Sequence, residues 1–295
     1  MQDYTKPFFI IGNPRSGTSL FRLMLSNHPG MIVPPESGFM QWWYPTYHNW
    51  TAEDTANEAY LNQFIKDLSS SKKIETWKID FDSLKLRIQK VIPKNYAQLI
   101  AQVYLQYTAD NGNKNIERWG DKNNYFIEHL DLLHEIYPQA QFLFIVRDGR
   151  DVACSYKAIK NLKTESAYKP KLPYDIKDIA NEWVENHQTI LKFSRALEPS
   201  QCHFLKYEDL VLNPKAVLKE VTDFLKMEFS IEMLNYPDTN RSNKTEPLEM
   251  MDWKKKTLSE PDSSELGKYK KILSTREIQE FNKIAKPILN HFGYE

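Results

Sequence analysis

The chain has 295 residues, with 39 lysines and arginines against 39 aspartates and glutamates, so its formal net charge is near zero. This balance gives no sign of nucleic-acid or membrane partners, and no apolar run approaches the roughly 18 residues of a membrane-spanning helix. Cys154 and Cys202 lie outside any CxxC pattern, which fits a soluble protein of a reducing cytoplasm. No Gly/Ser- or Pro-rich linker divides residues 1–295, so we expect a single domain.

The first predicted unit is a strand, a loop and a helix within residues 8–27. Residues 8–11 (FFII) are apolar and lie between Pro7 and Gly12, which is typical of a short buried strand. Apolar residues then recur at helical spacing from Gly17 to residue 27. The backbone N–H groups of the loop between strand and helix point at one spot, next to the positive end of the helix dipole. We therefore expect the loop to bind an anion.

The loop has the spacing of a nucleotide P-loop but not its chemistry. It reads GNPRSGTS over residues 12–19, and Thr18 stands where the P-loop pattern has a lysine. Kinases and ATPases use that lysine on the β- and γ-phosphates, whereas the cation of this loop is Arg15. The letters PRSGTSL resemble the 5′-phosphosulfate loop of sulfotransferases, which use 3′-phosphoadenosine-5′-phosphosulfate (PAPS). The resemblance implies that the donor is bound by Arg15, Ser16, Gly17, Thr18 and Ser19.

An aromatic cluster follows a second short strand, which we expect at residues 31–33. The cluster is too dense for an ordinary surface loop and is interrupted by Pro45. Two interpretations stay open: the side chains pack against the core, or they form the wall of an acceptor pocket, since such pockets are mostly apolar. The predicted wall consists of Phe39, Trp42, Trp43 and Tyr47.

Helices and one strand are expected between this cluster and residue 137. Residues 51–68 predict a helix with Thr51 as N-cap and Asp54 as its acidic third residue. Pro93 opens a second helix that ends at residues 111–112. Residues 116–119 can form a strand that leads into the segment GDKNN, and a further helix then runs to residue 137.

Residues 141–146 (QFLFIV) are the clearest predicted strand. They are apolar on both faces, so we expect this strand to be central in a parallel sheet. Arg147 follows directly, where a Walker-type NTPase would have a magnesium-binding aspartate, and Ser155 lies two turns into the next helix. Arg147 and Ser155 match the 3′-phosphate motif of sulfotransferases, which implies that they bind the phosphate that distinguishes PAPS from ATP. Arg150 is expected in a structural ion pair with a nearby carboxylate.

The second half of the chain continues the alternation of helices and strands. We expect a loop at residues 162–174, a long helix at 175–197, a strand at 203–205 and a closing helix at 275–292. The segment YEDL, which starts at Tyr207, resembles sulfotransferases again. The resemblance implies that Tyr207 lies beside the nucleotide and that Glu208 and Asp209 cap the next helix. The family also folds a basic C-terminal loop over the nucleotide, to which we assign Ser242 and one of residues 254–256, with Lys254 as the choice.

Together these elements predict an α/β fold with a central parallel β-sheet flanked by helices and a P-loop-like phosphosulfate-binding loop. In such sheets the ligand binds at the carboxyl ends of the strands. The two predicted anion sites follow two strands, so they would bracket one nucleotide.

Most of the chain resembles the tyrosylprotein and carbohydrate branch of PAPS-dependent sulfotransferases. The resemblance implies that Glu36 takes the acceptor proton, with His48 as the alternative base, and that Lys122 stabilises the leaving oxygen. Arg15 would act beside Lys122. The donor would be PAPS and the product 3′-phosphoadenosine-5′-phosphate (PAP). We expect no metal, because fixed cations can offset the developing charge.

The acceptor does not follow from the resemblance. The secretory relatives carry a membrane anchor and disulfides, which we do not expect here, so the favoured hypothesis is a cytoplasmic enzyme that sulfates a hydroxyl or amine of a small metabolite. One alternative is a P-loop kinase-like phosphotransferase, which Thr18 and Arg147 disfavour. The other is an inactive nucleotide-binding scaffold. The oligomeric state is not written in the sequence.

Overall fold

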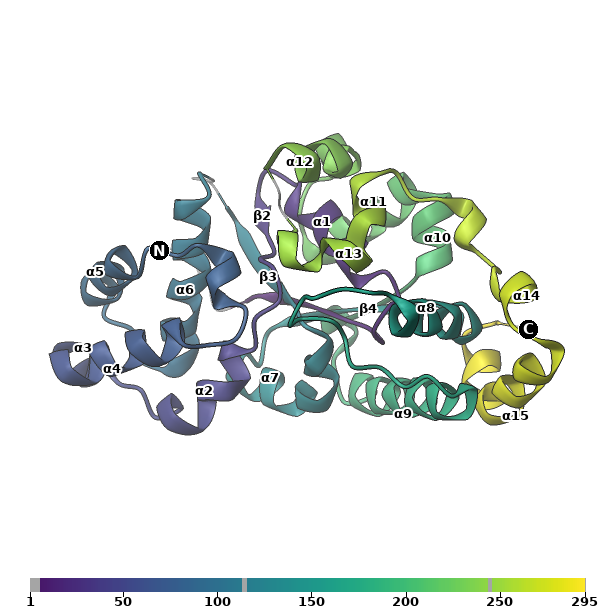
Figure 1. Ribbon diagram of the computed structural model, residues 1–295. Helices are drawn as coiled ribbons and strands as arrows, with labels where there is room; N and C mark the ends of the chain where they lie inside the picture. The colour runs from purple at the N-terminus through teal and green to yellow at the C-terminus, as the bar shows by residue number, and fades with distance from the viewer. Residues whose placement is uncertain (1–5, 113–115, 244–245, 295) are drawn as a thin grey trace.

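A single five-stranded sheet organises the molecule (Figure 1). The computed structural model describes residues 6–112, 116–243 and 246–294. Its strands run in the order β2-β3-β1-β4-β5, and every neighbouring pair is parallel. The strands are β1 (Phe8–Ile11), β2 (Met31–Ile32), β3 (Arg118–Lys122), β4 (Gln141–Val146) and β5 (Cys202–Lys206). The predicted parallel α/β fold is therefore confirmed, with β4 in the interior between β1 and β5.

Helices cover both faces of the sheet and extend beyond its β2 edge (Figure 1). The first half of the chain contributes α1 (Thr18–Ser26), α2 (Phe39–Tyr47), α3 (Ala52–Ala56), α4 (Glu58–Ser69), α5 (Phe81–Val91), α6 (Tyr96–Asp110), α7 (Leu130–Ile136) and the 3-10 turns η1 (Ile74–Trp77) and η2 (Asn124–His129). The second half contributes α8 (Gly149–Asn161), α9 (Ile176–Ser194), α10 (Tyr207–Leu212), α11 (Pro214–Leu225), α12 (Tyr236–Asn243), α13 (Met251–Lys254), α14 (Tyr269–Ile272) and α15 (Thr275–His291).

Alternate residues of β1 face two separate hydrophobic cores. Phe9 and Ile11 belong to the core that includes α6, α7 and α9, whereas Phe8 and Ile10 belong to the core that includes α1 and α11. Because both faces are covered, the strand is apolar along its whole length, as parallel strands commonly are. This two-sided burial fixes the position of the loop that follows β1.

The strand register brings four functional segments to one edge of the sheet. Ile10 pairs with both Lys122 of β3 and Leu143 of β4, and Val146 pairs with Lys206 of β5. All strands are parallel, so their carboxyl ends lie together. The β1–α1 loop, the end of β3, the residue after β4 and the start of α10 therefore meet at the same edge.

Several predicted helices differ from the observed ones. The helix expected at residues 51–68 is two helices, because Asn57 leaves the helical conformation and its side chain caps α4 by accepting from the N–H of Tyr60 at 3.2 Å. The helix expected from Pro93 begins after Asn95, whose side chain is its N-cap. The prediction of one helix up to residue 137 was also wrong, since η2 precedes α7.

Arg150 and Glu208 test two predictions of side-chain contacts. Arg150 forms the expected ion pair, with Asp148 at 2.8 Å, and Cys154 is a buried core residue. Glu208 does not cap the next helix: its Oε1 accepts from the backbone N–H of Asp148 at 3.0 Å and joins α10 to the β4–α8 turn. Pro287 lies inside α15 without ending it.

Candidate active site

The loop between β1 and α1 forms a cradle of backbone groups. Arg15 and Gly17 have left-handed backbone conformations, with φ of 70° and 92°, and Gly17 is the N-cap of α1. A Cβ on Gly17 would lie 2.2 Å from the Tyr207 ring, so only glycine fits both the dihedral and the space. Helix α1 begins directly after this residue, so its free N–H groups and the positive end of its dipole face the loop.

Polar contacts from α8 and α9 brace the start of this loop. The Asn13 amide donates to the Tyr156 hydroxyl at 3.0 Å, and Asn186 donates to the Asn13 side-chain oxygen at 2.7 Å. Tyr156 in turn donates to Glu182 at 2.6 Å. These contacts tie the loop to two helices that follow β4, and nothing in the sequence pattern indicated them.

Arg147 lies between the loop and Tyr207. Its Nη1 donates to the carbonyl oxygen of Arg15 at 3.3 Å and its Nη2 to that of Glu265 at 3.2 Å. The guanidinium carbon is 4.3 Å from the centre of the Tyr207 ring, a cation–π contact. The structure thus brings together Arg15, Arg147 and Tyr207, which the sequence analysis took from three separate motifs.

Several buried polar atoms of these elements lack a partner. The Nε atoms of Arg15 and Arg147 and the hydroxyl of Ser16 have no hydrogen-bond partner among the described residues. Burial and the nearby guanidinium of Arg147 both lower the pKa of Arg15. Two adjacent guanidinium groups with free donors are costly to bury unless they bind something. The chemistry that satisfies them is an anion.

Ser155 faces a cation that the sequence analysis missed. The Nζ of Lys268 donates to the Ser155 hydroxyl at 3.2 Å and to Glu265 at 3.0 Å. Burial, followed by the charge of Arg147, lowers the pKa of Lys268. Lys268 lies outside the basic run that we assigned to the C-terminal loop, so no motif signal pointed to it.

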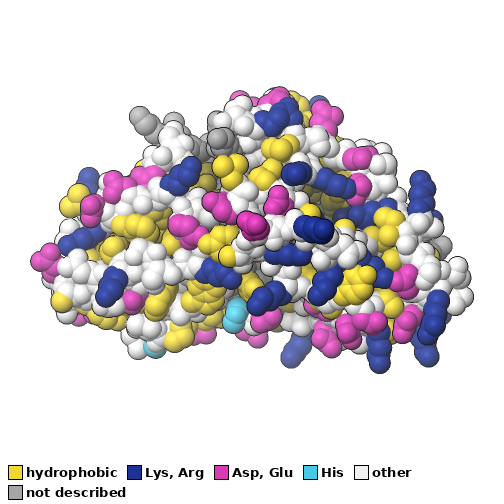
Figure 2. Space-filling model, viewed as in Figure 1, with side chains coloured by type: hydrophobic (Ala, Val, Ile, Leu, Met, Phe, Trp, Pro, Cys, Tyr) yellow, Lys and Arg dark blue, Asp and Glu magenta, His cyan; other side chains and the backbone are white. Residues whose placement is uncertain are grey.

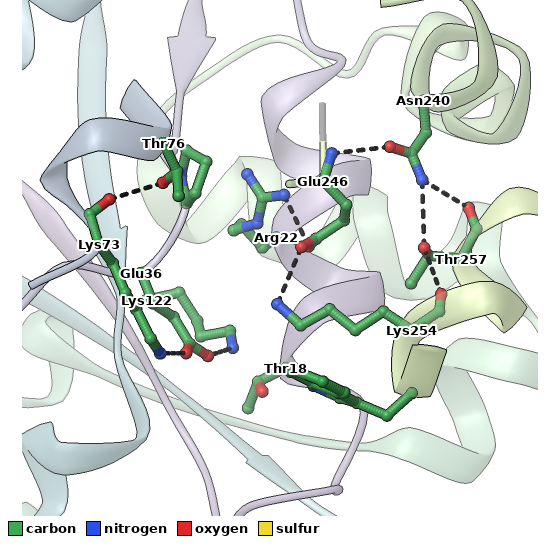
Figure 3. Close-up of polar contacts among 12 residues, drawn as sticks. Thr18, Arg22, Glu36, Lys73, Thr76, Lys122, Asn240, Glu246, Lys254 and Thr257 are labelled. Carbon is green, nitrogen blue, oxygen red and sulfur yellow. Dashed lines mark hydrogen bonds and ion pairs between the residues drawn. The ribbon is translucent and has the colours of Figure 1, made fainter. Parts of the chain in front are cut away.

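Glu36 forms a cluster with two lysines, Lys73 and Lys122 (Figure 3). Its Oε1 contacts the Nζ of Lys122, and its Oε2 lies 2.8 Å from the Nζ of Lys73. Burial alone would raise the pKa of Glu36, but the ammonium groups of Lys122 and Lys73 hold it well below its usual value. Burial lowers the pKa of Lys122 to about 8, against the opposing effect of Glu36. The pair is therefore charged at neutral pH.

Lys254 belongs to a second, fully buried network. Glu246 accepts from Arg22 of α1 at 2.7 Å and from Lys254 of α13 at 2.8 Å. Figure 3 shows this cluster beside the Glu36 cluster, with Asn240 donating to the backbone and side chain of Thr257. The network fastens the C-terminal segment to the helix of the anion loop.

One cavity of about 1280 Å³ joins these clusters. Of the predicted site residues, it is lined by Arg15, Gly17, Thr18, Ser19, Glu36, Lys122, Arg147, Ser155, Tyr207 and Lys254. Ser16 is a buried residue of the loop and is outside the lining. Ser242 is exposed at the end of α12 and is outside the lining, as is the exposed His48. Lysine and arginine side chains gather near the centre of the face shown in Figure 2.

The predicted aromatic wall is only partly in the cavity. Trp42 lines it, whereas Phe39 and Tyr47 are buried in the core between α2, α4 and α6. Trp43 packs against the same core and its Nε1 donates to Ser71 at 2.8 Å. For these three residues the structure favours the core-packing interpretation. The cluster belongs to α2, whose Pro45 lies within the helix instead of preventing it.

Within residues 6–112, 116–243 and 246–294, no group of three or more histidine, cysteine, aspartate or glutamate residues is arranged to hold a metal ion. No helix in the same residues combines the length and apolarity needed to cross a membrane.

The fold and the site define an α/β protein whose P-loop-like turn and neighbouring strand ends present two arginines to an anionic ligand. The family model described as Sulfotransferase family matches residues 7–230. The chain therefore belongs to the sulfotransferase family.

The curated relatives relate the chain to the protein-tyrosine branch of the family. The chain is 24% identical over 241 residues to a putative protein-tyrosine sulfotransferase of Caenorhabditis briggsae, and the match covers 80% of this chain and 71% of that protein. It is 23% identical over 288 residues to the protein-tyrosine sulfotransferase of Drosophila melanogaster, covering 97% of this chain but 51% of that protein. The chain thus spans between half and three-quarters of the length of these two relatives.

A solved structure agrees with the fold. The sulfotransferase domain from the curacin biosynthetic pathway superposes with a TM-score of 0.61 at 22% identity, covering 98% of both chains.

Proposed function

We propose that the protein transfers a sulfuryl group from PAPS to a hydroxyl or amine of an acceptor. The observation that carries this proposal is the pairing of Arg15 and Arg147 in one cavity that Tyr207 also lines, with Nε atoms that are buried and lack partners among the described residues. A nucleotide with anionic groups on both its 5′ and 3′ positions satisfies both guanidinium groups. Family membership supports the same donor.

The 5′-phosphosulfate is assigned to the β1–α1 loop. The N-terminal N–H groups of α1 face the turn, Thr18 and Ser19 line the cavity beside it, and Arg15 supplies the positive charge. Thr18 replaces the lysine of a nucleotide P-loop, and its hydroxyl contacts the Asn124 side chain at 3.5 Å. The loop therefore holds the group without the residue that kinases use on the γ-phosphate.

The 3′-phosphate is assigned to Arg147, Ser155 and Lys268. The Lys268 ammonium and the Ser155 hydroxyl already contact one another at 3.2 Å, and Arg147 lies at the end of the adjoining strand. Two cations and a hydroxyl match the charge and acceptor oxygens of a phosphate monoester. ADP and ATP lack this phosphate, so this subsite would select PAPS over them.

Glu36 and Lys122 are assigned to the chemical step. The acceptor oxygen or nitrogen attacks sulfur, the bond from sulfur to the bridging oxygen breaks, and its electron pair stays on the phosphate of PAP. Glu36 takes the acceptor proton, and the charged Lys122 stabilises the developing negative charge on the bridging oxygen. Glu36 is 9% exposed and lines the cavity, so an acceptor within the cavity can reach it.

A small metabolite is the acceptor class that we favour. Part of the segment at residues 162–174 lines the cavity, and hydrogen bonds fix it to two other segments: Tyr168 donates to Glu75, and Thr164 donates to Asp252 at 2.5 Å. A cavity lined by a segment that is fixed in this way suits a small molecule better than a folded polypeptide. Protein tyrosine is the second candidate, because the curated relatives named above are protein-tyrosine sulfotransferases.

The test is turnover of PAPS with a panel of acceptors. The purified protein is incubated with PAPS and p-cresol, a primary alcohol, a primary amine or a tyrosine-containing peptide, and PAP and sulfated product are measured by mass spectrometry. We expect product with at least one acceptor, and a 10²–10⁴-fold loss in Glu36→Gln. Glu53→Gln, on the exposed face of α3, is the matched control and should retain activity. Full activity of Glu36→Gln would exclude Glu36 as the base.

A further inference from the structure

Lys73 comes from a segment far from every sulfotransferase motif, yet it reaches the centre of the site. Its Nζ lies 2.8 Å from Glu36 Oε2, while Lys122 contacts the other carboxylate oxygen (Figure 3). The side chain of Lys73 is 16% exposed and lines the cavity. Glu36 is therefore held from two sides, by a strand end and by the turn that precedes η1.

The backbone turn at Lys73 holds its side chain near Glu36. Lys73 has a φ of 70°, a conformation that glycine adopts at lower cost than lysine. Its carbonyl accepts from Thr76 Oγ1 at 2.7 Å, which closes the turn. Two further contacts join this turn to the Glu36 segment: Ser37 donates to the carbonyl of Lys72 at 3.2 Å, and Trp77 Nε1 to that of Pro35 at 2.8 Å.

We propose that Lys73 is a positioning residue for Glu36: its ammonium keeps the carboxylate ionised and oriented while Lys122 serves the leaving oxygen. This inference rests on the proposed function, since it takes Glu36 as the proton acceptor. Lys122 alone cannot interact with the bridging oxygen as the bond to sulfur breaks and also fix the Glu36 carboxylate. A second lysine on Oε2 separates the two tasks and leaves the other lone pairs of the carboxylate free for the acceptor proton.

The charges that face Glu36 come from four segments. Lys122 of β3 and Lys73 of the turn touch it, and Lys254 of α13 acts on it through space. Arg15 of the anion loop also interacts with it electrostatically. Burial, with a further contribution from Glu36, raises the pKa of Asp121 on β3, and Glu246 interacts electrostatically with Lys122. Among the cations, only Lys73 and Lys122 contact the carboxylate in the described residues, so removing Lys73 removes half of its direct pairing.

The matched variants are Lys73→Met, Lys73→Arg and Lys72→Met. The two Lys73 variants keep a Cβ and so the same backbone strain, and the arginine restores the positive charge. Lys72 is the adjacent lysine: it is exposed and faces the Tyr168 ring at 5.8 Å, as Lys73 does at 6.0 Å. It differs from Lys73 in lacking the contact with Glu36, so it controls for loss of one positive charge from the same turn.

The first readout is the titration of the Glu36 carboxyl by carbon-13 NMR, assigned with Glu36→Gln. It needs no acceptor and so separates this inference from the proposed function. We expect the titration to move up by about one pH unit in Lys73→Met, and to stay as in the wild type in Lys73→Arg and Lys72→Met. An unchanged titration in Lys73→Met would overturn the proposal, whether or not the protein turns over PAPS.

The second readout is the pH profile of kcat/KM for PAP formation with p-cresol, whose hydroxyl titrates near the tyrosine pKa of about 10. The acid limb should move to higher pH in Lys73→Met, so that activity below the limb falls about tenfold relative to the wild type. A purely structural loss would lower the profile at all pH values without moving the limb, which would contradict the proposal. A shifted NMR titration without any wild-type turnover would instead remove the proposed function and leave the Lys73–Glu36 coupling in place.

Discussion

The ring of Tyr207 occupies the space that a side chain at Gly17 would need: a Cβ there would lie 2.2 Å from the ring. The same ring stacks on the guanidinium of Arg147 at 4.3 Å. One aromatic side chain therefore holds both the turn of the anion loop and the arginine at the end of β4. In the proposed function, this side chain sets the two anion subsites relative to each other.

Gly17→Ala should separate this steric effect from backbone strain. Gly17 and Gly112 both have left-handed φ values, 92° and 76°, but a Cβ at Gly112 meets nothing within 4 Å. Gly112→Ala should cost only the dihedral term, about 1–2 kcal/mol, and keep PAP binding. Gly17→Ala should in addition displace Tyr207 and abolish PAP binding, measured by calorimetry. Equal PAP affinity in the two variants would show that the Tyr207 contact does not shape the loop.

The basic limb of the pH profile should report Lys122. Burial lowers the pKa of this lysine to about 8, so its positive charge is lost as the pH rises through that value. We expect kcat/KM for PAP formation to fall about tenfold per pH unit above the limb. Lys122→Arg keeps its charge throughout this range, so its profile should lack the limb. A limb near pH 8 that persists in Lys122→Arg would assign it to another group.

The buried Glu246 network should make the protein acid-sensitive in a defined window. The charges of Arg22 and Lys254 lower the pKa of Glu246 from 4.5 to about 2, against the opposing effect of burial. Because the folded pKa is depressed, this stabilisation is complete above about pH 4.5 and is lost as the pH falls toward 2.

Urea unfolding of the Glu246→Gln variant at several pH values tests this pH range. At pH 7 the substitution should lower the free energy of unfolding by about 3–5 kcal/mol, because two buried cations lose their partner. The difference from the wild type should shrink between about pH 4.5 and 2. A constant difference down to low pH would mean that the carboxylate charge is not what the network requires.

The sheet and the proximity of Arg15, Arg147 and Tyr207 could be predicted because their signals are local. The strands at residues 8–11 and 141–146 are continuous apolar runs with abrupt ends, and both were placed to the residue. Arg147 and Tyr207 directly follow strands, Arg15 lies in the loop that follows β1, and parallel strands bring their carboxyl ends together. Knowing the strands was therefore enough to predict that these residues meet.

The features that could not be predicted lack a local signal, and the position of Lys73 depends on contacts between segments that are distant in the sequence. Nothing local distinguishes Lys73 from Lys72, and its role appears only when the turn before η1 lies against the Glu36 segment. The helix α5 was not predicted, and α2 was obscured by Pro45, which lies near the helix end. The short helices between residues 231 and 272 also have too few residues for a periodic pattern.

The central claim is that the cavity selects a nucleotide with a 3′-phosphate, and calorimetry of PAP, ADP and ATP without magnesium tests it most directly. The wild type should bind PAP more tightly than ADP or ATP. Arg147→Ala should weaken PAP binding by about 1.5–3 kcal/mol, roughly a ten- to hundredfold rise in Kd, and leave ADP binding largely unchanged. Equal affinity for PAP and ADP, or PAP binding that is unaffected by Arg147→Ala, would contradict the account.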